Sequence, residues 1–253
     1  KNTYLTFNLV MGSGLDLELN LAMQILDYVL LSAPGAPVKQ RLLDEGVGKD
    51  VVSSYEDGIL QPFFSIMAKN AEAADKERFL CLIREELEKI CKEGIPEKAI
   101  ASGINYFEFR FREADYASYP KGLIYGMDTF DSWLYDDDAP FTYLKQLQLF
   151  ADLRRKAKEG YFEDLIRIYF LENTHSSVLV GVPERGLEVK KEQALDKAMA
   201  ARKAEMSGEE LEKLVTATHH LAEYQDEEDS PEIKACIPLL KRTDIRREAK
   251  KLY

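Results

Sequence analysis

The sequence predicts an α+β domain with a mainly antiparallel sheet packed by helices, followed by a long helical hairpin. A run of alternating apolar and polar residues lies near the start of residues 1–183 and a short apolar run near their end, and helical apolar spacing fills most of the chain between them. After Pro183 the composition shifts to Lys, Glu and Ala. We therefore expect two parts, residues 1–183 and residues 184–253.

The first strand and its helices follow from a change of period. Residues 4–9 alternate with a period of two and lead into the turn Gly12-Ser13-Gly14. From Asp16 the apolar spacing becomes helical, and Ala33-Pro34-Gly35 ends that helix before a short second one at 38–45. Because Lys1 is not a methionine and the strand begins almost at once, the chain reads as a piece of a longer polypeptide.

The next elements form a predicted hairpin and a helical series. Residues 51–55 and 59–67 are β-rich and flank Glu56-Asp57-Gly58, which predicts an antiparallel pair of strands. Helices are expected at 75–91, from Pro96 to about 111, and at 123–134, 141–157 and 162–170. Residues 177–182 predict a last, buried strand. The helices should cover one side of the sheet.

The second part should be a helical hairpin, followed by an acidic loop at residues 226–231 and a tail. Residues 184–206 predict one helix, and Ser207-Gly208-Glu209-Glu210 has the spacing of a capping box that starts another. Residues 236–253 carry little apolar content before a basic tail, so we expect no core there.

Composition excludes several classes of protein. With 34 basic and 45 acidic side chains in 253 residues, the net charge of −11 argues against nucleic acid as a partner. The best apolar run, Leu26–Ser32, is too short to span a membrane. Cys81, Cys91 and Cys236 form no Cys-x-x-Cys pair, which fits buried thiols in a reducing compartment, so we expect a cytoplasmic location.

Candidate chemical sites are weak. His219, His220 and Glu223 share one helix, but a catalytic zinc normally has three protein ligands, and a solvated patch is the favoured interpretation. Asp136-Asp137-Asp138 is interpreted as a solvated loop. Gly12-Ser13-Gly14 lacks the third glycine of a dinucleotide loop and is interpreted as a turn. The sequence shows no catalytic triad, so it predicts neither catalytic nor metal-binding residues.

Two further features are of interest. If the strand at 51–55 lies at the edge of its sheet, its free N–H and C=O groups could hold an extended peptide by strand addition, although an ordinary paired strand is the simpler interpretation. Trp133, the only tryptophan, is expected to be a core or inter-helix anchor.

Several segments, in this order along the chain, resemble the second domain of the pitrilysin/insulinase superfamily of zinc metalloendopeptidases, in its presequence-protease branch. The similar segments include Asn20-Leu-Ala-Met-Gln-Ile-Leu-Asp-Tyr-Val-Leu30, residues 37–46, Ile104-Asn-Tyr-Phe-Glu-Phe-Arg-Phe-Arg-Glu113, residues 122–125 and 133–138, and Pro231-Glu-Ile-Lys-Ala-Cys-Ile-Pro-Leu-Leu240. Ala139 interrupts the Asp-Pro that is usual in that branch.

The resemblance implies a LuxS/MPP-like metallohydrolase fold and a clamshell enzyme that cuts unfolded peptides. In such an enzyme zinc is bound by His-x-x-Glu-His in another domain, and this sequence contains no such motif. It therefore implies a non-catalytic chain without a cofactor of its own, whose partners are the remaining domains of the parent peptidase and the peptide. Residues 1–183 would be chamber wall, and residues from 184 on a hinge between the halves.

The resemblance also implies an exosite, a strand edge that anchors one end of the peptide. By the order of elements it falls on Val52, Ser53, Ser54, Tyr55 and Glu56, and the net negative charge would favour basic peptides. The alternative from another class is a helical protein-interaction adaptor with no link to proteolysis. Nucleotide binding at residues 12–14 ranks far below both.

Overall fold

The structure is a computed structural model that describes residues 3–114, 116, 118–237 and 241–244. Contacts within the chain divide it into two units, residues 1–183 and residues 184–253. Most of the segment 236–253, for which we expected no core, lies outside the described residues. Each unit is described by itself.

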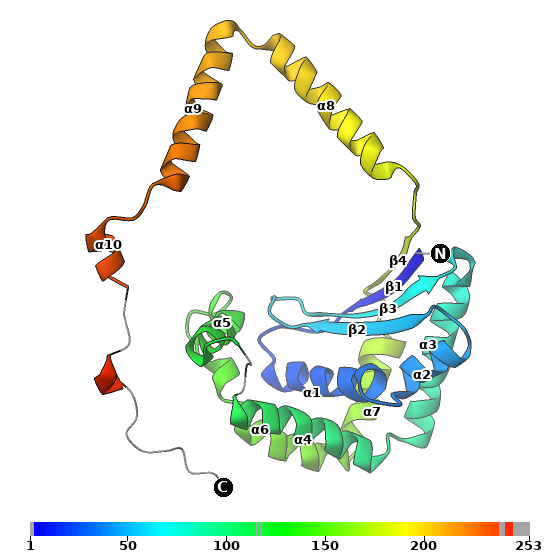
Figure 1. The fold of residues 1–253 in the computed structure, drawn as a ribbon. Helices are drawn as coiled ribbons and strands as arrows, with labels where there is room; N and C mark the ends of the chain where they lie inside the picture. Colours follow the sequence, from blue (N-terminus) through cyan, green and yellow to red (C-terminus); the bar gives the residue numbers. More distant parts are fainter. Residues whose placement is uncertain (1–2, 115, 117, 238–240, 245–253) are drawn as a thin grey trace. The chain divides into compact units, whose positions relative to one another are not determined.

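The first unit is built on one antiparallel sheet. Its described strands are β1 (Thr3–Val10), β2 (Asp50–Glu56), β3 (Phe63–Ala71) and β4 (Ser176–Gly181), in the order β2-β3-β1-β4. Every neighbouring pair is antiparallel, so β2 and β4 form the two edges. The α+β class with an antiparallel sheet is confirmed (Figure 1).

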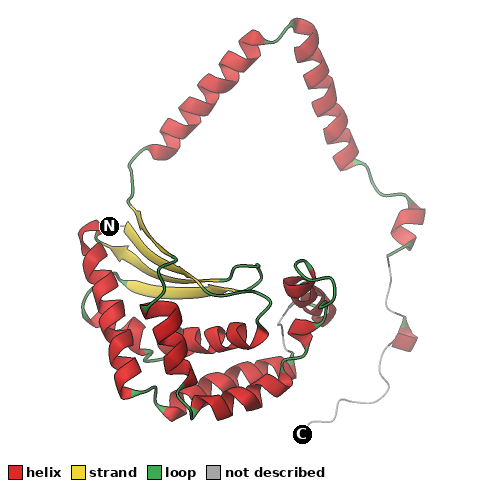
Figure 2. Cartoon of the chain, turned by 180° about the vertical axis from the view of Figure 1, so that it is seen from behind, coloured by secondary structure: helices red, strands yellow, loops and turns green. Residues whose placement is uncertain are grey.

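Helices cover one face of this sheet and leave the other open (Figures 1 and 2). Asp16 caps the first helix by accepting a hydrogen bond from the Leu19 N–H (3.0 Å). The helical segments are α1 (Leu17–Asp27) with a π-helical turn (Tyr28–Ser32), α2 (Pro37–Asp44), α3 (Lys76–Glu93), α4 (Glu97–Glu113), α5 (Lys121–Trp133), a 3₁₀ turn (Thr142–Leu144), α6 (Leu147–Ala157), and α7 (Tyr161–Ile166) with a π-helical turn (Arg167–Leu171).

The core lies between the helices and the covered face of the sheet. Alternation along β1 and β3 sends Leu5, Leu9, Phe64 and Ile66 to that face, where each is almost completely buried. The ring of Phe64 packs edge-on against Phe170, with centroids 4.9 Å apart. The period of two in the sequence therefore marks the core correctly.

Three expectations about burial were wrong. The strand β4 is exposed rather than buried, because it is an edge strand. Trp133 is 46% exposed and stacks on Phe130 of its own helix, since α5 buries only Ser132. Cys81 and Cys236 are exposed free thiols, and Cys91 is half-buried.

The predicted hairpin exists, but its second strand begins later than expected. Strand β3 starts at Phe63 rather than Ile59, so the connection is longer than an Asp-Gly turn. The side chains of Ile59 and Leu60 are exposed, and the Pro62 carbonyl accepts from the Met11 N–H (2.7 Å). The helix expected at 141–157 is likewise divided into a 3₁₀ turn and α6.

The turn before α1 requires a glycine at position 14. A Cβ atom on Gly14 would lie 2.4 Å from the carbonyl oxygen of Ile59, too close for any other residue. The turn follows a strand of an antiparallel sheet, which a dinucleotide-binding fold would not contain.

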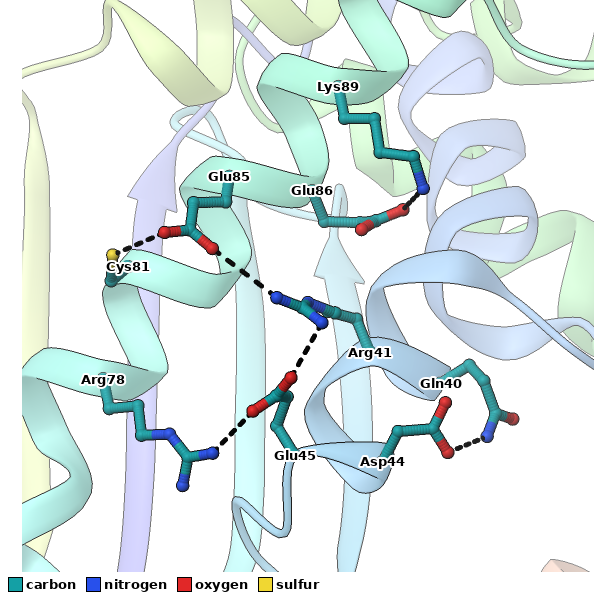
Figure 3. Close-up of polar contacts among 9 residues, drawn as sticks. All are labelled: Gln40, Arg41, Asp44, Glu45, Arg78, Cys81, Glu85, Glu86 and Lys89. Carbon is teal, nitrogen blue, oxygen red and sulfur yellow. Dashed lines mark hydrogen bonds and ion pairs between the residues drawn. The ribbon is translucent and has the colours of Figure 1, made fainter.

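Polar side chains join α2 to α3 at the surface (Figure 3). Arg41 contacts Glu45 at 2.8 Å and Glu85 at 3.7 Å, and Arg78 contacts Glu45 at 2.6 Å. The Glu85 carboxylate also accepts from the Cys81 thiol, which raises the pKa of that thiol. Exposed pairs stabilise little one by one, so the packing of α2 and α3 rests mainly on their apolar faces.

The helical segment 17–44 is long and apolar enough, by length and composition, to span a membrane, with a mean hydropathy of 1.3 in its best window. Leu21, Ile25 and Leu26 of this segment are almost completely buried in the core. Core packing therefore accounts for its apolar character.

The second unit consists of exposed helices, α8 (Leu187–Glu205), α9 (Gly208–Asp226) and α10 (Pro231–Ala235). The capping box is confirmed, because Ser207 and Glu210 exchange side-chain-to-backbone hydrogen bonds. Neither α8 nor α9 has a buried residue, so the expected hairpin has no core of its own among the described residues.

We expect Phe64→Ala to destabilise the first unit by about 3 to 5 kcal/mol, because it leaves a cavity against Phe170 in the centre of the core. Urea unfolding followed by circular dichroism measures the change. Phe109→Ala is the matched control, since Phe109 is 68% exposed, and it should change stability by less than about 1 kcal/mol. Equal effects of the two substitutions would contradict the assignment of the core.

Candidate functional site

The predicted exosite residues lie on an edge strand. Val52, Ser53, Ser54, Tyr55 and Glu56 all belong to β2, which pairs only with β3 among the described strands. Their role as a site stays a prediction, but the geometry that it requires is present: an extended strand with one free side.

Side chains of β2 alternate between the two faces of the sheet. Register with the buried residues of β3 places Ser53 and Tyr55 on the covered face, and Val52, Ser54 and Glu56 on the open face. The five residues therefore do not form one cluster of side chains. What they share is the backbone of the edge.

The backbone groups that point to the free edge can be identified from the register. The Met11 N–H donates to the Pro62 carbonyl. At the start of β3 the backbone N–H and C=O groups of even-numbered residues therefore point to β1, and those of odd-numbered residues point to β2. The β2 partners of those odd-numbered residues are Val52, Ser54 and Glu56. Alternation then directs the N–H and C=O groups of Val51, Ser53 and Tyr55 to the free edge.

A buried amide holds the end of β2 in place. Asn20 of α1 is fully buried; its Nδ2 lies 3.2 Å from the Ser13 carbonyl, 3.1 Å from the Gly14 carbonyl and 2.9 Å from the Tyr143 hydroxyl. Its Oδ1 accepts from the Tyr55 hydroxyl. Tyr143 in turn donates to the Gly14 carbonyl at 2.7 Å. Both tyrosines are thereby fixed, and burial raises the pKa of each.

A cavity of about 840 Å³ lies beside the covered face of β2. It is lined from α1 and its π-helical turn, from the end of β2, and from α4, α5 and α6. Ser32 at its wall lies 3.5 Å, Oγ to Oγ, from Ser53. Of the five residues expected to anchor a peptide, Tyr55 therefore lines the cavity and Ser53 lies next to its wall.

Four carboxylates line this cavity: Asp27, Asp57, Asp128 and Asp131. Burial, followed by the charges of Asp57 and Asp128, raises the pKa of Asp131 to about 6. Burial also raises the pKa of Asp128, and Arg110 offsets part of this increase. The charge of Asp57 raises the pKa of both Asp128 and Asp131, because the three carboxylates share one partly enclosed space.

The other two carboxylates are partly satisfied. Asp57 accepts from Gln24 Nε2 at 2.5 Å, and Oδ2 of Asp27 accepts from the Ser32 hydroxyl at 3.0 Å. Burial still raises the pKa of both groups, against these hydrogen bonds and the nearby Ser53 hydroxyl. Oδ1 of Asp27 is buried without a hydrogen-bond partner among the described residues.

Sequence reasoning missed this cavity. Asp57 was assigned only to a turn, and Asp27 only to the span of the first helix. The one available signal was the spacing of Asp128 and Asp131, which places both on one side of a helix. Their meeting with Asp27 and Asp57 depends on tertiary structure.

The described residues do not fit a zinc site. No group of three or more His, Cys, Asp or Glu side chains among them is placed to hold a metal ion. His219, His220 and Glu223 lie exposed on α9, and Asp137 and Asp138 lie exposed in a loop. We derive no chemical step through a metal in this chain.

We expect Asp131→Asn to stabilise the first unit by about 1 kcal/mol at pH 7.5, with the raised pKa discounted for partial exposure. The folded state binds the Asp131 proton more tightly than the unfolded state does, so stability falls as pH rises from about 4 through 6. The gain should therefore disappear at pH 4. Urea unfolding at both pH values tests this, with Asp138→Asn as the control, and no gain at pH 7.5 would contradict it.

Two family models match the chain. The inactive domain of peptidase family M16 matches residues 1–106, and the associated region of subfamily C of the same peptidase family matches residues 182–253. Together they cover β1, β2, β3 and the first helices, and the whole second unit, whereas β4 lies between the two matched ranges.

Curated relatives match over nearly all of this chain. Protein HypA of Clostridium perfringens is 36% identical over 99% of this chain and 26% of its own length. Presequence protease 1, chloroplastic/mitochondrial, of Arabidopsis thaliana is 34% identical over 92% of this chain and 22% of its own length. The chain thus spans about a quarter of the relatives that it matches.

A solved structure has the same fold. The inactive peptidase domain of a protein from Bordetella parapertussis, assigned as a zinc protease, aligns with 73% of this chain and 94% of its own, with a TM-score of 0.53 and 9% identity. The family models, the relatives and the antiparallel sheet agree. The chain therefore belongs to the M16 (pitrilysin/insulinase) family of peptidases and contains an inactive domain of that family.

Proposed function

We propose that this chain is the substrate-holding, non-catalytic part of a zinc metalloendopeptidase that degrades unfolded peptides. Residues 1–183 would form part of the wall of a substrate chamber, and residues 184–253 would link it to the remaining domains. The parent enzyme, rather than this chain, would bind zinc. Membership in the M16 family and the match to its inactive domain support this proposal.

The observation that carries the proposal is the free edge of β2. An extended peptide can add to an exposed edge through main-chain hydrogen bonds, which depend little on the peptide's sequence. Val51, Ser53 and Tyr55 would supply the backbone groups, and the Asn20 contacts hold the end of the strand. Such anchoring suits an enzyme whose substrates share an unfolded chain rather than a sequence.

The location is proposed on separate grounds. The exposed thiols of Cys81 and Cys236 would be open to oxidation in an oxidising compartment. We therefore propose a reducing, intracellular location.

Ser53→Pro should weaken the binding of an extended peptide by roughly tenfold or more, because it removes a backbone donor from the free edge. Proline is tolerated on an edge strand where the N–H faces solvent, so the sheet should persist. Fluorescence anisotropy with a labelled unstructured peptide measures the affinity, and circular dichroism measures the fold. Ser53→Ala is the matched control, since it removes the hydroxyl and keeps the N–H.

A second measurement keeps this test independent of folding. A peptide N-methylated at every residue should bind the unaltered chain more weakly than one methylated at alternate residues, because strand addition uses every second N–H and the second peptide keeps one edge that can pair. Equal affinity of all methylated peptides, together with full binding by Ser53→Pro, would refute strand addition at β2.

The purified chain should contain no stoichiometric zinc and should not hydrolyse peptides, because it lacks His-x-x-Glu-His. Elemental analysis and a peptide-cleavage assay with and without a chelator measure this. His219→Ala/His220→Ala should change neither result. Chelator-sensitive hydrolysis by the purified chain would contradict the proposal.

A further inference from the structure

The cavity beside β2 is placed to receive a side chain of a peptide held on that strand. A strand added to the free edge would continue the sheet, so its side chains would alternate between the open face and the covered face. On the covered side Tyr55 lines this cavity of about 840 Å³, and Ser53 lies 3.5 Å, Oγ to Oγ, from Ser32 in its wall. A side chain on the covered face would therefore enter it.

We propose that this cavity binds the cationic side chain of a lysine or arginine residue in the peptide held on β2. This inference rests on the proposed function and adds a substrate preference to it. Backbone pairing would supply affinity that depends little on sequence, and the cavity would select one side chain.

The charges of the lining favour a cation. Asp27, Asp57, Asp128 and Asp131 face the cavity, and Arg110 is the one Lys or Arg side chain among its described lining residues. Asp128 and Asp131 make no hydrogen bond or ion pair with another described residue, although Arg110 acts on Asp128 at longer range. An ammonium or guanidinium group could therefore pair with these two carboxylates without breaking an existing hydrogen bond or ion pair among the described residues.

A buried acceptor atom in the lining also favours a cationic ligand. Oδ1 of Asp27, a residue that lines the cavity, is buried and has no donor at hydrogen-bond distance among the described residues, although the Ser53 hydroxyl lies near enough to lower the pKa of this carboxyl in part. A buried acceptor without a donor destabilises the folded state, and buried polar atoms normally have a partner. Ammonium and guanidinium groups carry several donors and no acceptor, so they can satisfy Asp27 without creating a new unpaired group.

Aromatic rings complete the lining. Tyr28 and Tyr106 stack with centroids 4.8 Å apart and an angle of 10° between the rings. Both residues line the cavity, as do Phe107 and Tyr116. Aromatic rings pack on the methylene stem of a lysine and attract its charge. A metal ion fits less well, since the described side chains form no group of three donors placed to hold one.

Two peptides that differ at one position test the proposal. The reference peptide is unstructured and carries one central lysine, and its partner carries norleucine, which keeps the stem and lacks the charge. At physiological ionic strength, which weakens general attraction to the charge of −11, the lysine peptide should bind roughly tenfold more tightly. Equal affinity for the two peptides would refute cation binding in the cavity but would not refute strand addition. No binding of either peptide would refute both proposals.

Paired variants locate the effect. Asp128→Asn/Asp131→Asn should remove the preference for lysine while the norleucine peptide keeps its affinity. Asp137→Asn/Asp138→Asn removes the same charge from an exposed loop outside the cavity and should keep the preference. Loss of the preference in both variants would show that general charge attracts the peptide and would overturn the proposal.

The preference for the lysine peptide should also become weaker as the pH is lowered. Protonation of Asp131, whose pKa is raised to about 6, removes a negative charge, so discrimination should weaken from pH 7.5 to pH 5.5. The lysine side chain of the peptide stays charged over this range. A preference unchanged at pH 5.5 would overturn the proposal. The titratable and charged groups that line the cavity are Asp27, Tyr28, Tyr55, Asp57, Tyr106, Arg110, Tyr116, Tyr119, Asp128, Asp131 and Tyr143.

Discussion

The candidate site depends on one buried amide. Asn20 links the turn before α1, the last inward residue of β2 and the 3₁₀ turn before α6, three segments distant in sequence. A fully buried amide costs free energy unless its hydrogen bonds are made, so these segments must keep their positions for Asn20 to remain satisfied. The end of the edge strand and one wall of the cavity are thereby fixed by the same side chain.

The carboxylates of the cavity lower the stability of the folded state, and the rest of the first unit compensates for this loss. These carboxylates have raised pKa values because burial disfavours their charged forms, and repulsion from neighbouring carboxylates adds to this at Asp128 and Asp131. Such groups lower the stability of the folded state at neutral pH. A packed core beneath the sheet offsets that loss, and a bound cation would remove part of it. Strain of this kind at a cavity, combined with a well-packed core, is more typical of a binding site than of a purely structural contact.

Prediction from sequence succeeded where a local pattern decides the structure. The alternation in β1 and the helical stripe of α1 give the elements and the inward faces, because both patterns reflect burial of one face. Prediction failed where contacts with distant segments of the chain determine whether a residue is buried. Residues 177–182 look like a buried strand, yet β4 is exposed because nothing in this chain pairs with its outer side among the described strands. Trp133 likewise looks like a core residue and is half exposed.

The site divides in the same way. The exosite on β2 was predicted from the order of elements and the family resemblance and stays a prediction. The cavity was not predicted, since Asp27, Asp57 and Asp131 come from three segments. Only the packing of α5 near the end of β2 brings them together. A charged residue in a solvent-exposed turn and one in a ligand cavity have the same sequence signal.

A free strand edge must also avoid pairing with a second copy of itself, because unprotected edges promote aggregation. Here the same negative charge can serve both needs. Two copies paired along β2 would bring two carboxylate-lined cavities and two net charges of −11 together, whereas a cationic peptide would meet complementary charge. The electrostatics of the edge therefore separate the wrong partner from the proposed one, even though the backbone groups that would hold either are identical.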